Sequence, residues 1–346
     1  MPTRGTPHAR GVESAGPLGH ELEAVLARYG SEAGHYSVLG PDPWSVLWNE
    51  DRSGFVAFLE ARHCVLSWRS PVARAEEQGM LFSRLVDYAR DVDKQLFAVP
   101  VNDTVRAAAL ERGLLDTWIG TECYLDLPTW SLAGGRRQKV RWARSHAAKL
   151  GLTWREADPS TVPGDFAGLG RIERRWKDQR RERRTDSFLR NSFTELMSRR
   201  RYFVCEGPRG IIASISCTPI NATRWYLQDP VREPEAPRGA LEGAMALALD
   251  TFRDEGYLVA SNGPLPFWDP EHDGTTPHTF GALGDRVLAY FDHRYRFQHI
   301  NQFRSKFVPD ATMPVYLVRS HRVITPRAVH SLTRLLTKAP REHPTS

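Results

Sequence analysis

The chain has 346 residues, of which 41% are hydrophobic and 25% are charged, and its formal net charge is +6 at pH 7. These values are typical of a globular protein with room for two domains of ordinary size. No stretch approaches the roughly 18 apolar residues of a membrane-spanning helix, and the basic N-terminus lacks the apolar core of a signal peptide. We therefore expect a cytoplasmic protein.

The ends of the chain and its cysteines carry little chemistry. Residues 1–19 and 338–346 are polar and are expected to be disordered arms. The four cysteines form no Cys-x-x-Cys pair and lie in apolar, strand-like runs, so we expect buried, reduced thiols. No cluster of cysteine and histidine has the spacing of a metal site.

The first half of the chain alternates between helical and strand-like patterns. Asp103 is expected to cap a helix that begins at Thr104 and ends at Gly113. Helices are predicted over residues 20–30, 74–91 and 104–113, and strands over 45–48, 54–59, 63–68, 95–101 and 121–127. This order favours the N-acetyltransferase-like (GNAT) fold for residues 20–130.

The second half repeats that order after a linker over residues 128–135. Basic helical segments over 136–150 and 168–201 are followed by strands over 202–206, 210–219 and 223–227. A helix that Gly239 opens, and strands over 257–261 and 315–318, complete the half. We therefore predict an α/β (α+β) protein with tandem GNAT-like domains, 20–130 and 136–320. Each is expected to hold a mixed, mostly antiparallel sheet flanked by helices, with the functional site in the second domain.

Positive charge is concentrated between residues 136 and 201, which hold 19 Lys and Arg against 8 Asp and Glu. A basic block inside a folded domain indicates an anionic partner, either nucleic acid or an anionic membrane surface, although a solvated face is the alternative. The side chains that we expect to bind phosphates are Arg137, Arg141, Arg144, Lys177, Arg180, Arg181 and Arg184.

Several short motifs occur in a fixed order along the chain. They are Leu66–Val72 (LSWRSPV), Ile119–Glu122 (IGTE), the basic segment from Gly135 to Gly151, Pro237-Arg238-Gly239 with Glu242, Gly263–Phe267 (GPLPF), and Phe303–Pro309 (FRSKFVP) with Tyr316-Leu317 after it. Together they resemble the C-terminal domain of the bacterial phosphatidylglycerol lysyltransferases, over roughly residues 35–318. That family consists of tandem-GNAT enzymes that transfer an aminoacyl group from charged tRNA to a hydroxyl group.

The chain also departs from the family pattern. The acid and arginine that follow the third strand of the family align with Asp229 and Arg232 only after a shift, and the tryptophan after the Lys-Phe-x-Pro motif is missing. The membrane-spanning half of those enzymes has no counterpart here. For that reason we expect a small soluble acceptor, as in antibiotic or other specialised-metabolite assembly, with a membrane lipid as the alternative.

The resemblance implies catalysis without a cofactor, with aminoacyl-tRNA as the donor substrate. Lys306 is expected either to contact the terminal ribose or phosphate or to stabilise the developing oxyanion. Asp229 is expected either to act as the general base or to bind the α-ammonium group. Substrate binding is expected from Glu242, Arg232, Arg238, Gly239 and Gly263, and tRNA binding from the basic residues named above. Expected partners are charged tRNA and a small-molecule acceptor, with peripheral contact with an anionic membrane and no DNA.

Two other classes of function stay open. The loop before Gly239 reads Glu-Ala-Pro-Arg-Gly-Ala and lacks the first basic residue and the first glycine of a coenzyme A pyrophosphate loop, which disfavours an acyl-CoA N-acyltransferase. A non-enzymatic RNA-binding module is the remaining alternative.

Overall fold

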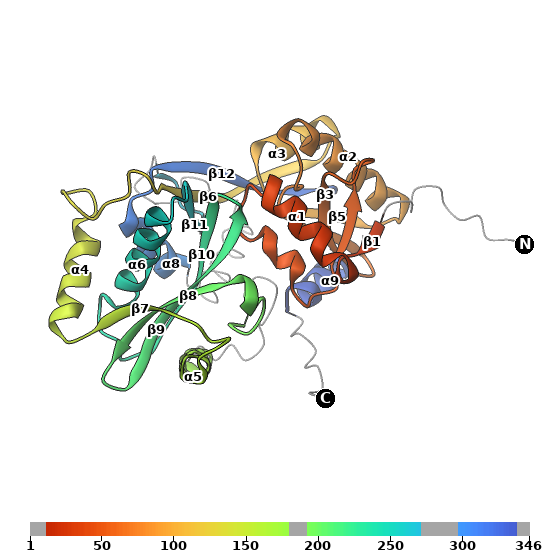
Figure 1. Cartoon of the computed structure of the whole chain (residues 1–346). Helices are drawn as coiled ribbons and strands as arrows, with labels where there is room; N and C mark the ends of the chain where they lie inside the picture. The colour runs from red at the N-terminus through yellow and green to blue at the C-terminus, as the bar shows by residue number, and fades with distance from the viewer. Residues whose placement is uncertain (1–11, 180–191, 271–296, 338–346) are drawn as a thin grey trace, which may run out of the picture.

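One sheet runs through both halves of the molecule (Figure 1). The computed structural model describes residues 12–179, 192–270 and 297–337, and in these residues the sheet has twelve strands in the order β1-β2-β3-β4-β5-β12-β6-β11-β10-β9-β8-β7. The strands are β1 (Val12–Ser14), β2 (Ser45–Trp48), β3 (Phe55–Glu60), β4 (Cys64–Trp68), β5 (Gln95–Val101), β6 (Leu115–Asp126), β7 (Thr153–Ala157), β8 (Arg201–Gly207), β9 (Gly210–Asn221), β10 (Arg224–Arg232), β11 (Val259–Pro266) and β12 (Ala311–Arg319).

Each half contains one parallel pair of strands joined by a helix. β4 and β5 are parallel and α2 (Ala75–Asp91) connects them, while β10 and β11 are parallel and α6 (Ala240–Asp254) connects them. The other ladders between the described strands are antiparallel. This repeated β–α–β unit in a mostly antiparallel sheet confirms the predicted tandem GNAT-like arrangement.

The last strands of the two halves are exchanged. β6, from the first half, pairs with β11 of the second half, and β12, from the second half, pairs with β5 of the first. β6 and β12 also pair with each other along nine register positions, from Ala311↔Tyr124 to Arg319↔Leu115. The two halves are therefore joined by a continuous set of backbone hydrogen bonds.

Helices cover both faces of the sheet in each half. In the first half α2 and α3 (Asp103–Glu111) pack on one face, and α1 (Gly19–Tyr29) and α9 (Pro326–Thr337) pack on the other. In the second half α4 (Gln138–Lys149) and α6 share one face, and α5 (Pro163–Gln179) covers the opposite one. Alternate residues of β8 show the split, since Phe203 joins the α6 core and Tyr202 the α5 core.

The strands β10 and β11 pair only at their beginnings, from Arg224↔Val259 to Tyr226↔Ser261. Beyond that point β10 stays with β9 and β11 stays with β6. The N-terminus of α6 follows this divergence in the chain. Five predicted site residues lie around the start of α6, namely Arg232, Arg238, Gly239, Glu242 and Lys306.

Most predicted elements are present, but some details differ. Asn102, not Asp103, caps α3, because its side-chain oxygen accepts a hydrogen bond from the Val105 amide at 3.0 Å. The short strands β1 and β7 and the helix α9 were not predicted. Residues 12–18, which we expected to be part of a disordered arm, form β1 and a 3-10 turn. Residues 1–11 and 338–346 lie outside the described residues.

All four cysteines are buried and unpaired, as expected. Burial raises the pKa of the Cys123 and Cys205 thiols to about 12. None of the described helices has the length and apolar character to cross a bilayer. No group of three or more metal-ligating side chains occurs among the described residues.

Candidate functional site

Lys306 and Glu242 form an ion pair at the start of α6. Lys306 lies in a single 3-10 turn (Ser305–Phe307) that follows α8 (Phe297–Arg304), and its Nζ donates to Glu242 Oε1 at 2.8 Å. The second oxygen of Glu242 accepts the Gly239 amide at 3.1 Å, which caps the helix. The side chain of Lys306 is 25% exposed and that of Glu242 is 7% exposed. Glu242 is therefore engaged at both oxygens, and it positions Lys306.

Gly239 holds the N-terminus of α6 close to α4. Its φ of 103° is a left-handed conformation, and a Cβ atom there would lie 2.0 Å from the carbonyl oxygen of Ala143 in α4. Both the backbone conformation and the helix contact therefore require glycine. The role that the structure gives Gly239 is helix packing, which in turn fixes the position of Glu242.

The Gly-Pro-Leu-Pro motif lies within β11, at a bulge, rather than after the strand. Gly263 has a φ of 78°, and a Cβ atom there would lie 2.7 Å from the Arg304 guanidinium and 2.8 Å from the Tyr226 ring. Arg304 donates to the Pro264 carbonyl at 2.8 Å, and Asn262 donates to the Arg304 carbonyl at 2.9 Å. These contacts tie α8, and the Lys306 turn after it, to β11.

Asp229 lies on the α5 side of the sheet, and its contacts with the described residues do not include Lys306 or Glu242. Its carboxylate accepts from Gln228 at 3.0 Å and lies 3.7 Å from the buried Arg200 guanidinium. It lines a cavity of about 30 Å³ with Ser214 and Ser216. That volume suits about one water molecule, not an aminoacyl group. Its φ of 48° marks a bend in β10.

The two arginines near the α6 entrance are exposed. Arg232 donates to the Ala236 carbonyl at 3.1 Å, which stabilises the turn before α6. Arg238 lies over the ring of Trp142 at 5.4 Å, and Trp142 stacks on His146 at 5.2 Å. Trp142 is 54% exposed. We did not predict a role for Trp142 from the sequence, because we considered only the arginines of this helix as ligand-binding residues.

The basic residues expected to contact tRNA do not form one exposed stripe. Arg137 precedes α4 and is buried, and its guanidinium donates to the Phe307 carbonyl at 2.9 Å and to Asp310 at 2.9 Å. This placement corrects the prediction that Arg137 faces a ligand: it anchors the segment after Lys306.

The remaining members of that set are partly engaged. Arg141 donates to the Leu132 and Gly134 carbonyls, Arg144 lies 3.4 Å from Asp250, and Lys177 pairs with Glu173 at 3.3 Å. Arg180, Arg181 and Arg184 lie outside the described residues. The phosphate-binding role of these side chains stays a prediction.

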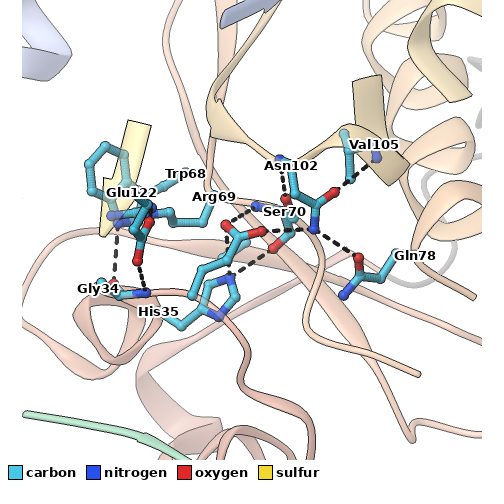
Figure 2. A network of polar contacts seen from close by, with 12 residues as sticks. Gly34, His35, Trp68, Arg69, Ser70, Gln78, Asn102, Val105 and Glu122 are labelled. Atoms are coloured by element: carbon cyan, nitrogen blue, oxygen red, sulfur yellow. Dashed lines mark hydrogen bonds and ion pairs between the residues drawn. The ribbon is translucent and has the colours of Figure 1, made fainter. Parts of the chain in front are cut away.

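A buried polar network lies in the first half (Figure 2), and the Ser261 hydroxyl joins it to the second half. Arg69, which follows β4 and is 2% exposed, pairs with Glu122 of β6 at 2.5 Å. Glu122 also accepts from the Ser261 hydroxyl at 3.0 Å, and that hydroxyl accepts the amide of Gly263 at 3.0 Å. The chain of contacts runs from the first half into the bulge of β11. Both charged residues belong to motifs whose role the sequence did not reveal.

The same network continues to a second carboxylate. Glu32 accepts from the Ser70 amide at 3.2 Å and from Asn102 at 2.9 Å, and His35 donates to the Ser70 carbonyl at 3.0 Å. Burial raises the pKa of Glu32 to about 6. Burial, together with the Arg69 charge, lowers the pKa of His35 to about 3, so the imidazole is neutral at pH 7.

Comparison with known proteins supports one family. The family model described as "Phosphatidylglycerol lysyltransferase, C-terminal" matches residues 24–319. The phosphatidylglycerol lysyltransferase of Staphylococcus epidermidis is 20% identical over 299 residues, which are 83% of this chain and 34% of that protein. The corresponding enzyme of Staphylococcus aureus is 21% identical over 301 residues, 84% of this chain and 34% of that protein. The chain thus spans about a third of the length of these relatives.

Solved structures share the fold. A C-terminal domain from Agrobacterium fabrum, titled as that of a lysylphosphatidylglycerol synthetase, superposes with a TM-score of 0.76 at 18% identity and covers 94% of this chain and 98% of its own. The L-PGS structure from Bacillus licheniformis gives a TM-score of 0.72 at 16% identity, over 95% of this chain and 99% of its own. With the match of the family model along most of the sequence, these findings show that the chain belongs to the phosphatidylglycerol lysyltransferase C-terminal domain family.

Proposed function

We propose that this chain is an aminoacyltransferase that moves an amino acid from aminoacyl-tRNA to a hydroxyl group of the phosphatidylglycerol headgroup. The observation that carries the proposal is the Lys306–Glu242 pair at the N-terminus of α6, within the family match. The relatives are named for a lipid acceptor, so a lipid takes the place of the small soluble acceptor expected from the sequence. Lysine is the first amino acid to test for the same reason.

The transfer balances without a redox step. The acceptor oxygen bonds to the ester carbonyl carbon, the carbon–oxygen bond to the terminal ribose breaks, and the acceptor's proton ends on the ribose hydroxyl. The barrier is lowered when the reacting groups are oriented and when the tetrahedral oxyanion meets a fixed positive charge. Lys306 supplies that charge in our proposal, since it is partly buried and the Glu242 carboxylate holds it in place.

The surroundings of Lys306 suit this role. An ammonium has three protons, and Glu242 accepts one of them, which leaves donors for a substrate oxygen. The centre of the Phe303 ring lies 5.7 Å from Nζ, within the range of a cation–π interaction. We assign no base role to Asp229, because it pairs with Arg200 and lines a cavity of water size.

The donor is proposed to approach along the α6 entrance. Arg238 and Arg232 are exposed there, the backbone amides of the helix start favour phosphate, and Trp142 offers an aromatic surface. A terminal nucleotide placed on this surface lies beside the Lys306 turn, because Gly239 and Glu242 connect the two.

The test uses the purified 346-residue chain with radiolabelled lysyl-tRNA and phosphatidylglycerol in detergent micelles. We expect labelled lipid that is absent without the acceptor and that forms far more slowly with Lys306→Ala. A parallel series of other charged tRNAs identifies the amino acid. If no charged tRNA supports transfer while coenzyme A binds saturably, the aminoacyl-tRNA proposal is wrong and the chain is an acyl-CoA enzyme.

A further inference from the structure

The surface around α9 carries free positive charge beside exposed apolar side chains. α9 lies on the first half of the molecule, away from the α4 and α6 helices of the candidate site (Figure 1). A cleft of about 340 Å³ separates it from the turn between β3 and β4. The side chains of Arg62 and His63 from the turn, and of His330 and Arg334 from the helix, line this cleft.

The charge of this cleft is not balanced by acids among the described residues. Its one carboxylate, Glu60, is already paired with Lys94 and accepts from the Tyr88 hydroxyl at 2.7 Å. Residues 311–337 contain four arginines and no Asp or Glu. Within the described part of the chain no ion pair or side-chain hydrogen bond involves Arg62 or Arg334, so both guanidinium groups are available to an anion.

Exposed apolar side chains lie in the loop before α9 and in the first turn of α9. Val323 is 73% exposed, Ile324 is 38% exposed and Val329 is 49% exposed. They are three of the ten exposed large hydrophobic residues in the described chain, and they fall within seven consecutive positions. Soluble surfaces seldom gather such side chains, and a patch of this kind marks an interaction site.

The patch is held in shape by the fold. Gln95 of β5 donates to the Val323 carbonyl at 3.2 Å, and the Gln95 amide donates to the His63 carbonyl at 3.2 Å. The loop and the β3–β4 turn are thus neighbours, and Thr325 caps α9 by accepting the Ala328 amide at 3.2 Å. Ala328 is fully buried, which fixes the face that α9 turns to the core.

We propose that this surface, made of Arg62, His63, Val323, Ile324, Val329, His330 and Arg334, docks the protein on a membrane rich in anionic phospholipid. The guanidinium groups would meet headgroup phosphates, and the valine and isoleucine side chains would enter the boundary of the acyl region. The surface contains no Trp, Tyr or Phe, and its exposed apolar side chains are the aliphatic ones of valine and isoleucine, which favours the acyl boundary of a lipid surface over the bases of RNA. The purpose of docking rests on the proposed lipid acceptor, but the binding itself does not require any transfer reaction.

The test is co-sedimentation of the full chain with vesicles. We expect binding to vesicles of phosphatidylglycerol and phosphatidylcholine at low salt, and little binding to pure phosphatidylcholine. Because each cation near an anionic surface is worth about a fivefold change in partitioning, R62Q/R334Q should weaken binding by an order of magnitude or more. V323S/I324S should weaken the vesicle binding that remains at a salt concentration high enough to screen the charges.

R209Q/K149Q removes the same charge from exposed positions of the second half and should bind vesicles as the wild type does. The R62Q/R334Q variant should still aminoacylate a water-soluble, short-chain phosphatidylglycerol at the normal rate. If R62Q/R334Q and V323S/I324S bind vesicles as well as the wild type does, the proposal is wrong. It is also wrong if these variants lose tRNA binding and keep vesicle binding. Absence of transfer to the short-chain lipid in every variant counts against the proposed function alone.

Discussion

Lys306 and Glu242 lie 64 positions apart in the sequence and 2.8 Å apart in the structure. The pairing gives Glu242 two tasks, since the same carboxylate caps α6 through the Gly239 amide. A change at Lys306 should therefore affect mainly the reacting geometry, whereas a change at Glu242 should also remove the cap of α6 and lower stability.

Lys306→Ala should lower the rate of transfer by roughly 100- to 1,000-fold, the usual cost of removing one oxyanion donor. Lys306→Arg keeps the charge and should retain part of the rate. The measurement is single-turnover transfer from lysyl-tRNA to micellar phosphatidylglycerol, with thermal unfolding as the check on folding. A fully active Lys306→Ala enzyme would remove Lys306 from the mechanism.

Gly239→Ala should destabilise the protein far more than Gly256→Ala. Both glycines have positive φ, 103° and 86°, so both substitutions strain the backbone by about 1 kcal/mol. Only at Gly239 does the new Cβ meet a backbone atom, the Ala143 carbonyl oxygen at 2.0 Å. Urea unfolding of the two variants measures the difference. Equal losses of stability would mean that α4 and α6 do not approach as described.

Glu122→Gln should lower the free energy of unfolding by about 3 kcal/mol, because it leaves the Arg69 charge buried without its partner. Arg69→Met in the same protein should restore part of that loss. A double-mutant cycle in urea isolates the interaction of the pair. Additive effects of the two substitutions would show that the ion pair has no coupling energy.

The neutral state of His35 should make stability depend on pH. Its pKa in the folded protein is lowered to about 3, so the stabilisation is complete above the ordinary value of 6.5 and is lost as the pH falls. Relative to His35→Gln, the wild type should lose roughly 2–3 kcal/mol between pH 6.5 and 4.5.

Glu32 has the opposite effect on the pH dependence of stability, because its pKa in the folded protein is raised to about 6. Its contribution to stability is complete below pH 4.5 and is lost as the pH rises through 6. It titrates in both proteins, so the difference between their unfolding curves reports His35. Parallel curves across this range would show that the imidazole does not titrate as a buried neutral group.

Trp142→Ala should weaken tRNA binding by about tenfold, the loss expected when one base loses its aromatic partner. Leu150→Ala is the matched control, since Leu150 is the C-cap residue of the same helix and is 52% exposed against 54% for Trp142. Filter binding at fixed salt measures both. An unchanged affinity in Trp142→Ala would place the tRNA elsewhere.

Local patterns predicted much of this architecture and part of the site. Apolar periodicity located α2, α6 and the central strands, and the motif order placed Lys306, Glu242 and Gly239 together. Arg137 illustrates what local patterns cannot predict. We placed it on the face of a helix, although α4 begins one residue later. Its guanidinium faces Asp310, a partner 173 positions away that no helical period indicates.

Pairing between distant segments was the other unpredictable part. The strand β12 was recognisable as a strand, but its place between β5 and β6 depends on hydrogen bonds to residues about 200 positions earlier. The Arg69–Glu122 pair joins two motifs that were visible separately, 53 positions apart. Spacing within one segment contains no information on such contacts.

The exchange of β6 and β12 also has a consequence for the order of synthesis. On the ribosome, β5 leaves the exit tunnel long before β12 is made, so its edge has no partner while the second half is translated. Without the second half, one edge of β5 and both edges of β6 lack the partner strands that they have in the complete fold. We therefore expect the central part of the sheet to close only after β12 has been made.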